Sequence, residues 1–200
     1  MKHLRSTLLA LAFALGAAAL PAQPAAPAAT AAVPAPAAPE PRTSPHETIT
    51  GFIGDTQVVV IYGRPYSKNP RTGAMRKIWG GLVPYGRLWR AGADEATLFI
   101  TRQPLRLGGT LVPAGAYSLF LLPAVDGSAR LILNREIGQY GSDPYDLKKE
   151  FARIDLHRDP LATSVDQFTI AVEESPGTGG GVLKFAWELT QFSVPFTVQK

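Results

Sequence analysis

The segment Gln57-Val58-Val59-Val60-Ile61-Tyr62 decides the fold class. Its consecutive β-branched residues favour an extended backbone, because side chains branched at Cβ have few rotamers and pack well on a pleated surface. The preceding segment, His46–Ile53, is joined to it through Gly54-Asp55, a pair typical of the short turn in a β-hairpin. We therefore predict an antiparallel hairpin whose second strand is buried on both faces.

Short apolar or alternating runs separated by turn residues continue through the rest of the chain. Gly108-Gly109 predicts a second hairpin, between Leu105–Leu107 and Leu111–Val112. The 18 prolines and 19 glycines argue against long helices and helical bundles. Further strands are expected at Ala96–Thr101, Ala116–Leu122, Ala129–Asn134, Phe151–Leu156, Gln167–Glu173, Val182–Leu189 and Phe192–Gln199. The expected fold is all-β: an antiparallel β-sandwich of about ten strands, Ig-like or jelly-roll, with one long ordered loop, and with a barrel as the alternative.

The N-terminal part of the chain has a different composition from the rest. Lys2 and Arg5 precede an uncharged, mostly apolar run from Leu8 to Leu20, which has the length of a secretory signal and is too short to span a bilayer. We expect a signal peptide over residues 1–22 and hence a periplasmic or secreted protein. Seven prolines and ten alanines then fill 17 of the 21 positions from 21 to 41, so residues 23–43 are expected to form an extended linker. The folded domain is expected at 44–200.

Several classes of protein are excluded or disfavoured by composition. The chain has no cysteine, so disulfides and thiol chemistry are excluded, and no later apolar run is long enough for a transmembrane helix. His46 and His157 are the only histidines beyond the expected signal peptide, which rules out a metal site of three histidines. No nucleophile elbow, phosphate-binding glycine loop or calcium loop occurs in the sequence. We expect neither a cofactor nor a metal.

The segment between Gly63 and Asp94 is strongly basic. It carries seven cations and no acidic residue before Asp94: Arg64, Lys68, Arg71, Arg76, Lys77, Arg87 and Arg90. The other ten Lys and Arg residues of positions 44–200 stand against 15 Asp and Glu, so the remainder of the domain has a net charge of −5. Such a separation draws anions to one end of the molecule, unless carboxylates of neighbouring strands neutralise the cations. The domain's net charge of +2 is too small to predict nucleic-acid binding.

The most distinctive part of the chain is Gly80-Gly81-Leu82-Val83-Pro84-Tyr85-Gly86-Arg87-Leu88-Trp89-Arg90-Ala91-Gly92-Ala93-Asp94-Glu95-Ala96-Thr97. It resembles the signature of a secreted bacterial family known as a domain of unknown function, numbered twenty-nine eleven. Other motifs occur along the chain in the order expected for that family: Tyr62-Gly63-Arg64-Pro65 before this segment, and Pro113-Ala114-Gly115-Ala116-Tyr117-Ser118-Leu119-Phe120, Asn134, Gln139-Tyr140-Gly141 and Trp187-Glu188 after it. The resemblance covers nearly all of residues 44–200 and implies no activity, cofactor or catalytic residue. Asp94 and Tyr140 stand where the family pattern has Asn and Trp.

We predict a non-catalytic envelope module that binds an anionic small molecule or a glycan. Arginine offers a planar fork for carboxylate or phosphate, and aromatic rings cover sugar rings or seal a loop onto its domain. The candidate binding residues are Arg64, Tyr85, Trp89, Arg90, Glu95, Asn134 and Tyr140. A module whose loop docks to a partner protein is an alternative.

A carbohydrate-active hydrolase that uses Glu95 is a further alternative, with Asp94, Asp146 or Glu188 as the second carboxylate. The competing interpretation is structural. Next to arginines Glu95 would form a bidentate ion pair with Arg64 or Arg90, and its lowered pKa would make it a poor general acid.

Overall fold

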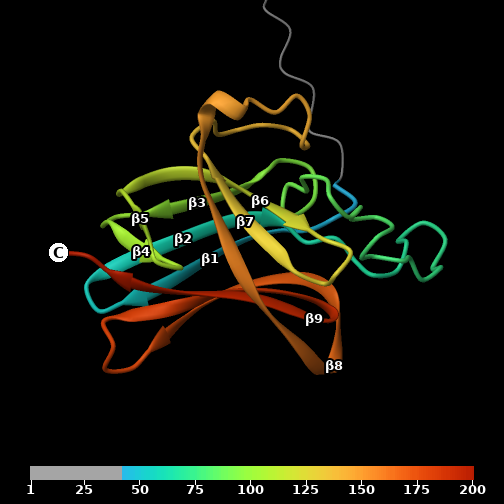
Figure 1. The fold of residues 1–200 in the computed structure, drawn as a ribbon. Helices are drawn as coiled ribbons and strands as arrows, with labels where there is room; N and C mark the ends of the chain where they lie inside the picture. The colour runs from blue at the N-terminus through green and yellow to red at the C-terminus, as the bar shows by residue number, and fades with distance from the viewer. Residues whose placement is uncertain (1–41) are drawn as a thin grey trace, which may run out of the picture. The chain divides into compact units, whose positions relative to one another are not determined.

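The computed structural model describes residues 42–200, which fold as an all-β domain (Figure 1). The strands are β1 (His46–Ile53), β2 (Thr56–Gly63), β3 (Thr97–Thr101), β4 (Leu105–Leu107), β5 (Thr110–Val112), β6 (Gly115–Pro123), β7 (Ala129–Asn134), β8 (Glu150–Ser175) and β9 (Gly180–Val198). The described residues contain one short 3₁₀ helix, η1 (Leu147–Lys149). The all-β prediction is confirmed. The expected signal peptide and all but the end of the expected linker lie outside the described residues.

The strands of the described domain form one antiparallel sheet of nine strands, in the order β1-β2-β3-β6-β7-β8-β9-β4-β5. The sheet is open, with β1 and β5 at its edges. Both expected hairpins are present: Ile53 lies opposite Thr56 across Gly54-Asp55, and Leu107 lies opposite Thr110 across the Gly108-Gly109 turn. The first glycine of each turn has a positive φ, as the tight turn requires.

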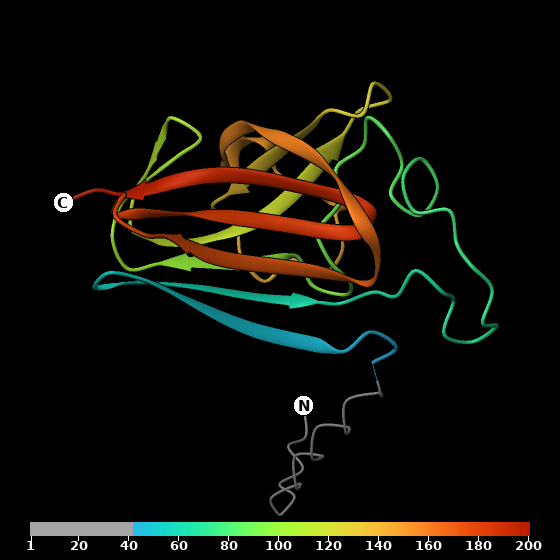
Figure 2. The same ribbon diagram turned by 90° about the horizontal axis from the view of Figure 1, so that it is seen from below.

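Two pairs of segments that we expected as separate strands are continuous. Phe151–Leu156 and Gln167–Glu173 are both parts of β8, which changes its partner from β7 to β9 at His157. Val182–Leu189 and nearly all of Phe192–Gln199 are likewise parts of β9. Register shifts near Val165 interrupt the β8–β9 ladder, and such irregularities bend a strand. Figures 1 and 2 show the β8–β9 hairpin lying below β2, β3 and β6 in the view of Figure 1. The two separate sheets of a sandwich are not confirmed, because the hydrogen-bonded ladder runs without a break through all nine strands.

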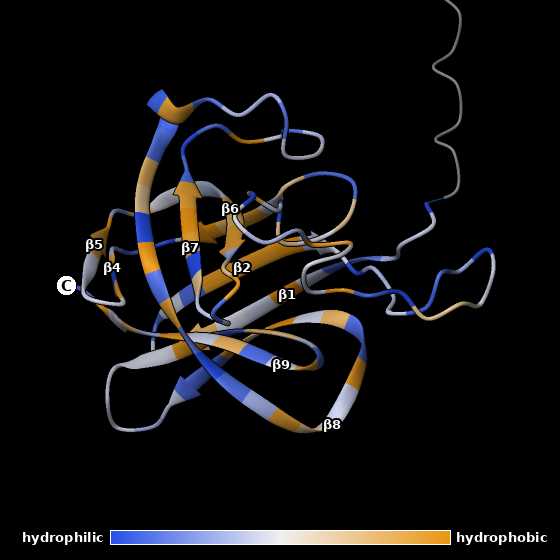
Figure 3. Ribbon diagram, turned by 45° about the vertical axis from the view of Figure 1, so that its right-hand side comes forward, coloured by the Kyte–Doolittle hydropathy of each residue, from blue (hydrophilic) through white to orange (hydrophobic). Residues whose placement is uncertain are grey.

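A single large hydrophobic core lies where the sheet folds over on itself. It includes Val58 and Val60 of β2, Phe168 of β8, and Phe185 and Trp187 of β9, each at most 1% exposed. Figure 3 shows mostly hydrophobic residues along β2, β6 and β7, and alternation along β8 and β9, which have one buried face.

The prediction that β2 is buried on both faces is wrong. Its residues alternate, and Ile61 is 37% exposed while Val60 is fully buried. Only one face of β2 is therefore covered by the hydrophobic core, and the other face is partly exposed to solvent.

Trp187 is the largest fully buried side chain, and its loss should be the most costly truncation in the core. Its indole Nε1 donates to the backbone oxygen of Asp166 at 3.2 Å. We expect Trp187→Ala to lower the free energy of unfolding by about 3–5 kcal/mol, because it leaves a large cavity in the core. Leu189→Ala, at a position of β9 that is 55% exposed, should change it by less than about 0.5 kcal/mol. Urea denaturation of both variants checks this, and similar losses for the two would contradict the assignment of the core.

Candidate functional site

The long connection between β2 and β3 is ordered and tied to the sheet. We call residues 64–94 the basic loop. Part of it extends outward from the strands at the right of Figures 1 and 2. Tyr66 bridges to Gln167 of β8, and Trp89 exchanges two backbone hydrogen bonds of 2.7–2.8 Å with Leu121 of β6. These contacts fix the base of the loop on both sides.

Aromatic packing anchors the same loop to the core. Trp89 stacks on Trp187 with 5.6 Å between ring centroids, and Trp79 meets Phe192 edge to face at 5.3 Å. Trp89 is only 7% exposed, and Phe168 packs against it at 4.8 Å. Although we predicted Trp89 as a binding residue, the structure places it in the core, where its ring has no free face for a ligand.

The half-buried arginines of the basic loop differ in how many of their guanidinium N–H groups have hydrogen-bond partners. Arg64 lies 3.2 Å from the carboxylate of Glu47 and donates to the backbone oxygen of Phe168 and to Thr169. Its fork is therefore occupied by protein oxygens. Arg90, in contrast, has a buried Nε with no hydrogen-bond partner among the described residues.

Four cations of the basic loop are exposed and not neutralised by neighbouring carboxylates. They are Lys68, Arg71, Lys77 and Arg87. Within residues 42–200, no carboxylate oxygen lies within 4.0 Å of any of them. The positive potential that the sequence predicted at this end of the domain is thus available to solvent and to ligands.

A second charged group, the Arg42 cluster, consists of Arg42, His46, Asp94 and Glu95. Arg42 donates to both carboxylate oxygens of Glu95, with 2.7 Å between Nη2 and Oε1. His46 Nε2 lies 3.1 Å from Asp94 Oδ2. The hydrogen bonds from Arg42 lower the pKa of Glu95 to about 2. The bidentate pair expected for Glu95 exists, but its partner is Arg42 and not Arg64 or Arg90.

Two glycines let the residues of this cluster approach one another. The amide of Ala93 donates to the oxygen of Gly63 at 3.2 Å, and a Cβ on Gly63 would come within 2.4 Å of the oxygen of Ala93 and 3.0 Å of His46 Nε2. A Cβ on Gly92 would come within 2.9 Å of the oxygen of Gly63. Asp94 then adopts a φ of 64°, a conformation that Asp and Asn reach more readily than most residues. Asp and Asn are therefore both compatible with this turn.

Asn134 is the last residue of β7, and Tyr140 lies in the loop that follows it. Asn134 is fully buried, where it donates to the oxygen of Asp146 at 3.1 Å and accepts from the amide of Glu136 at 2.8 Å. Tyr140 is 72% exposed and forms a backbone bridge with Glu95. Asn134 thus has a structural role in closing the loop, while the ring of Tyr140 is free.

The chemistry of the Arg42 cluster favours a structural role. Glu95 with a pKa of about 2 holds no proton to donate at neutral pH, and Asp146, one of the three candidates for the second carboxylate, caps η1 by accepting from the amide of Lys148 at 2.8 Å. Potential metal-ligand atoms of His46, Asp94 and Glu95 lie within 4.8 Å of one another. Arg42 already supplies the positive charge between them, so we assign no metal there.

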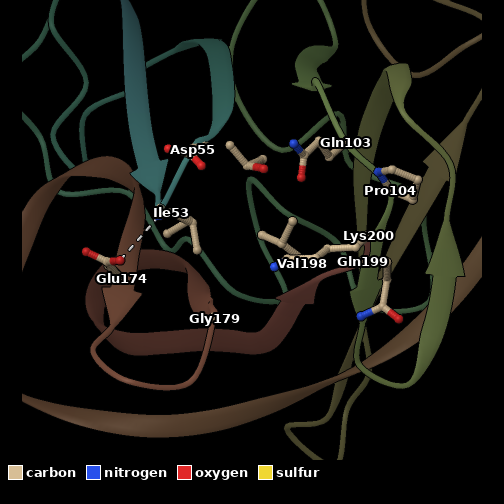
Figure 4. Close-up of a pocket in the computed structure, with 11 residues that line it drawn as sticks. Ile53, Asp55, Gln103, Pro104, Glu174, Gly179, Val198, Gln199 and Lys200 are labelled. Atoms are coloured by element: carbon tan, nitrogen blue, oxygen red, sulfur yellow. Dashed lines mark hydrogen bonds between the residues drawn. The ribbon is translucent and has the colours of Figure 1, made fainter.

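Three cavities bear on ligand binding. One of about 310 Å³ lies beside the Arg42 cluster, and Glu95 is the only predicted binding residue in its wall. The largest, about 640 Å³, lies at the β1–β2 and β8–β9 turns; Figure 4 shows Asp55 and Glu174 on one side of it and Gln103 and Gln199 on the other. Its carboxylates give it the wrong charge for an anion.

The third cavity lies between the basic loop and the strands of the sheet. This aromatic pocket, of about 140 Å³, is lined among others by Trp79, Tyr85, Gly127, Arg158, Thr190 and Phe192. It contains Tyr85 from the predicted set and adds Arg158, which we did not predict. Only its exposed position in β8 could have drawn attention to Arg158, and exposure cannot be read from the sequence.

The family model described as "Protein of unknown function (DUF2911)" matches residues 44–196. The chain belongs to this family. No curated protein and no solved structure shows a significant match. The resemblance drawn from the motifs is thereby confirmed. Several residues of the DUF2911 signature have structural roles here, since Gly63, Gly92 and Trp89 position the basic loop against the sheet.

No helix within residues 42–200 has the length and apolar character needed to cross a membrane.

The ion pair between Arg42 and Glu95 should make stability depend on pH. Because folding lowers the pKa of Glu95 from about 4.5 to about 2, the ionised carboxylate stabilises the fold above pH 4.5, and this contribution disappears as the pH falls toward 2. We expect Glu95→Gln to lower the free energy of unfolding at pH 7 by up to about 1 kcal/mol, as for a solvent-accessible pair. The difference from wild type should shrink below pH 4.5.

Denaturation at a series of pH values checks this, with Arg42→Ala as the second arm. The double variant should lose no more stability than either single variant, because the two residues act as a pair. Additive losses, or a difference for Glu95→Gln that stays constant with pH, would show that the pair does not form.

Proposed function

We propose that this protein is an exported, non-catalytic module that binds an anionic polymer on its basic loop. The supporting observation is the set of four exposed cations, Lys68, Arg71, Lys77 and Arg87, that no carboxylate of the described residues neutralises. Export rests on the apolar N-terminal segment of the sequence. Placement outside the cytoplasm would expose the loop to the polyanions of a cell envelope.

The arrangement of these cations favours an extended ligand over a small one. None of the four lines any of the cavities described above. A small anion bound in a cavity therefore could not contact them together, whereas a polymer laid along the loop could. Exposed charges of this kind attract a polyanion from a distance and increase its association rate.

Rigidity of the loop supports the same proposal. Trp79 and Trp89 anchor it to the core, so the charges are presented without the ordering cost that a free loop would pay on binding. The hydrolase alternative receives no such support, because Glu95 is ionised and held by Arg42.

Replacing the four cations with alanine should abolish most of the binding. We expect the Lys68→Ala, Arg71→Ala, Lys77→Ala and Arg87→Ala quadruple variant to bind heparin at least about tenfold more weakly than wild type at low salt, with a weaker salt dependence. Fluorescence anisotropy with labelled heparin over a series of salt concentrations measures both quantities.

The matched control removes four exposed cations elsewhere on the domain: Arg102, Arg106, Lys148 and Lys149. It has the same net charge as the test variant, so equal losses in the two would mean that heparin responds to overall charge and not to the basic loop. Wild-type protein that binds neither heparin nor polyglutamate at low salt would refute the proposal.

A further inference from the structure

The aromatic pocket is shaped by a glycine that seats Tyr85. Gly80 has a φ of 77°, and a Cβ at that position would come within 2.5 Å of the Tyr85 ring. The ring therefore lies directly against the backbone of the basic loop and is 37% exposed. The same tyrosine lines the aromatic pocket.

A second glycine, Gly127, lies against Arg158, which also lines the pocket. Gly127 has a φ of 87°, and a Cβ there would come within 3.0 Å of Arg158 Nη1. The neighbouring residues His157 and Asp159 bind each other, with 3.0 Å between Nε2 and Oδ1. Among the described residues, Arg158 has no carboxylate partner, so its planar fork is free to bind an anion.

Asp126, the acidic residue next to Gly127 in the sequence, already accepts hydrogen bonds from another residue. Asp126, in the β6–β7 turn, accepts hydrogen bonds from both the amide and the hydroxyl of Ser128, at 2.9 and 2.7 Å. These hydrogen bonds lower the pKa of Asp126. Its carboxylate therefore has donors of its own and leaves Arg158 unpaired.

Two side chains of the pocket suit a ligand that contains both a ring and an acidic group. Tyr85 offers an aromatic face, and Arg158 offers a bidentate donor. A volume of about 140 Å³ is below that of a pocket for a drug-sized molecule and suits a single sugar ring.

The position of the pocket connects it with the cations of the basic loop. Trp79 is two residues from Lys77, and Tyr85 is two residues from Arg87. The backbone positions of these two cations are therefore within a few ångströms of pocket residues, close enough for the neighbouring units of a polymer to reach them. A simple polyanion without rings would use the charges and leave the pocket empty.

We propose that the aromatic pocket binds one acidic sugar unit of a glycan, with its ring against Tyr85 and its carboxylate on Arg158. This inference rests on the proposed function and narrows its ligand from any polyanion to an acidic polysaccharide. It assigns specificity to the pocket and general attraction to the exposed cations of the loop.

The test compares three probes that differ in one property each. A short oligogalacturonate has rings and carboxylates, its methyl ester has rings without charge, and a polyglutamate of matched length has carboxylates without rings. Calorimetry with wild-type protein should give the tightest binding for the oligogalacturonate. Tyr85→Ala and Arg158→Ala should each weaken it about tenfold, while leaving polyglutamate binding unchanged.

Two control variants separate pocket effects from general ones. Tyr140→Ala removes an exposed tyrosine outside the pocket and should have no effect, and Arg158→Lys keeps the charge but not the fork and should resemble Arg158→Ala. Circular dichroism confirms that each variant is folded.

The outcomes distinguish this inference from the proposed function. Equal affinity for oligogalacturonate and polyglutamate, or pocket variants that bind oligogalacturonate as wild type does, would overturn the pocket assignment and leave the basic loop as a polyanion site. If no polyanion binds to wild-type protein, both proposals fail together.

Discussion

Stacking of Trp89 on Trp187 is the interaction on which the rest of the arrangement depends. It joins the C-terminal part of a long loop to a fully buried side chain of β9, with 5.6 Å between the ring centroids. Trp79 contacts the same two rings edge to face, so the loop shares the core of the sheet. A segment of this length with seven cations would otherwise repel itself and remain mobile. The core therefore holds in place a charge distribution that is unfavourable by itself.

The basic loop divides its residues between two tasks. Its large aromatic residues and glycines bring it close to the sheet, and its exposed lysines and arginines remain available. Arg64 is a cation that belongs to the anchoring residues. It lies at the loop's base, where Glu47 and oxygens of β8 bind its guanidinium group. Glu95 stabilises the other end through Arg42. The same few residues thus explain both why the loop is ordered and which of its charges are free.

Local features of the sequence were sufficient for the hairpins and for the strand content. Gly54-Asp55 and Gly108-Gly109 specify tight turns wherever they occur between apolar runs. The continuity of β8 could not be predicted in the same way, because Asp159-Pro160 resembles a turn, and only pairing with the distant strand β9 keeps the chain extended there. The sandwich was expected from strand spacing alone, and spacing does not determine whether two layers belong to one sheet.

The site was predictable only in part, for a related reason. Charge asymmetry identified the basic loop, but burial decides which aromatic ring or arginine is accessible, and burial depends on tertiary packing. Trp89 and Tyr85 have similar surroundings in the sequence, yet one lies in the core and the other borders a pocket. Arg42 lies 53 positions from its partner Glu95, inside a segment whose composition indicates a linker. Pairs so far apart leave no local pattern in the sequence.

An NMR titration of the domain with a heparin oligosaccharide tests the central claim most directly, since it reports every backbone amide at once. The account predicts chemical-shift changes concentrated in residues 66–88 and around Arg158, which become smaller as salt is added. Changes concentrated around the cavity that contains Asp55 and Glu174, or changes in the basic loop that are insensitive to salt, would contradict it.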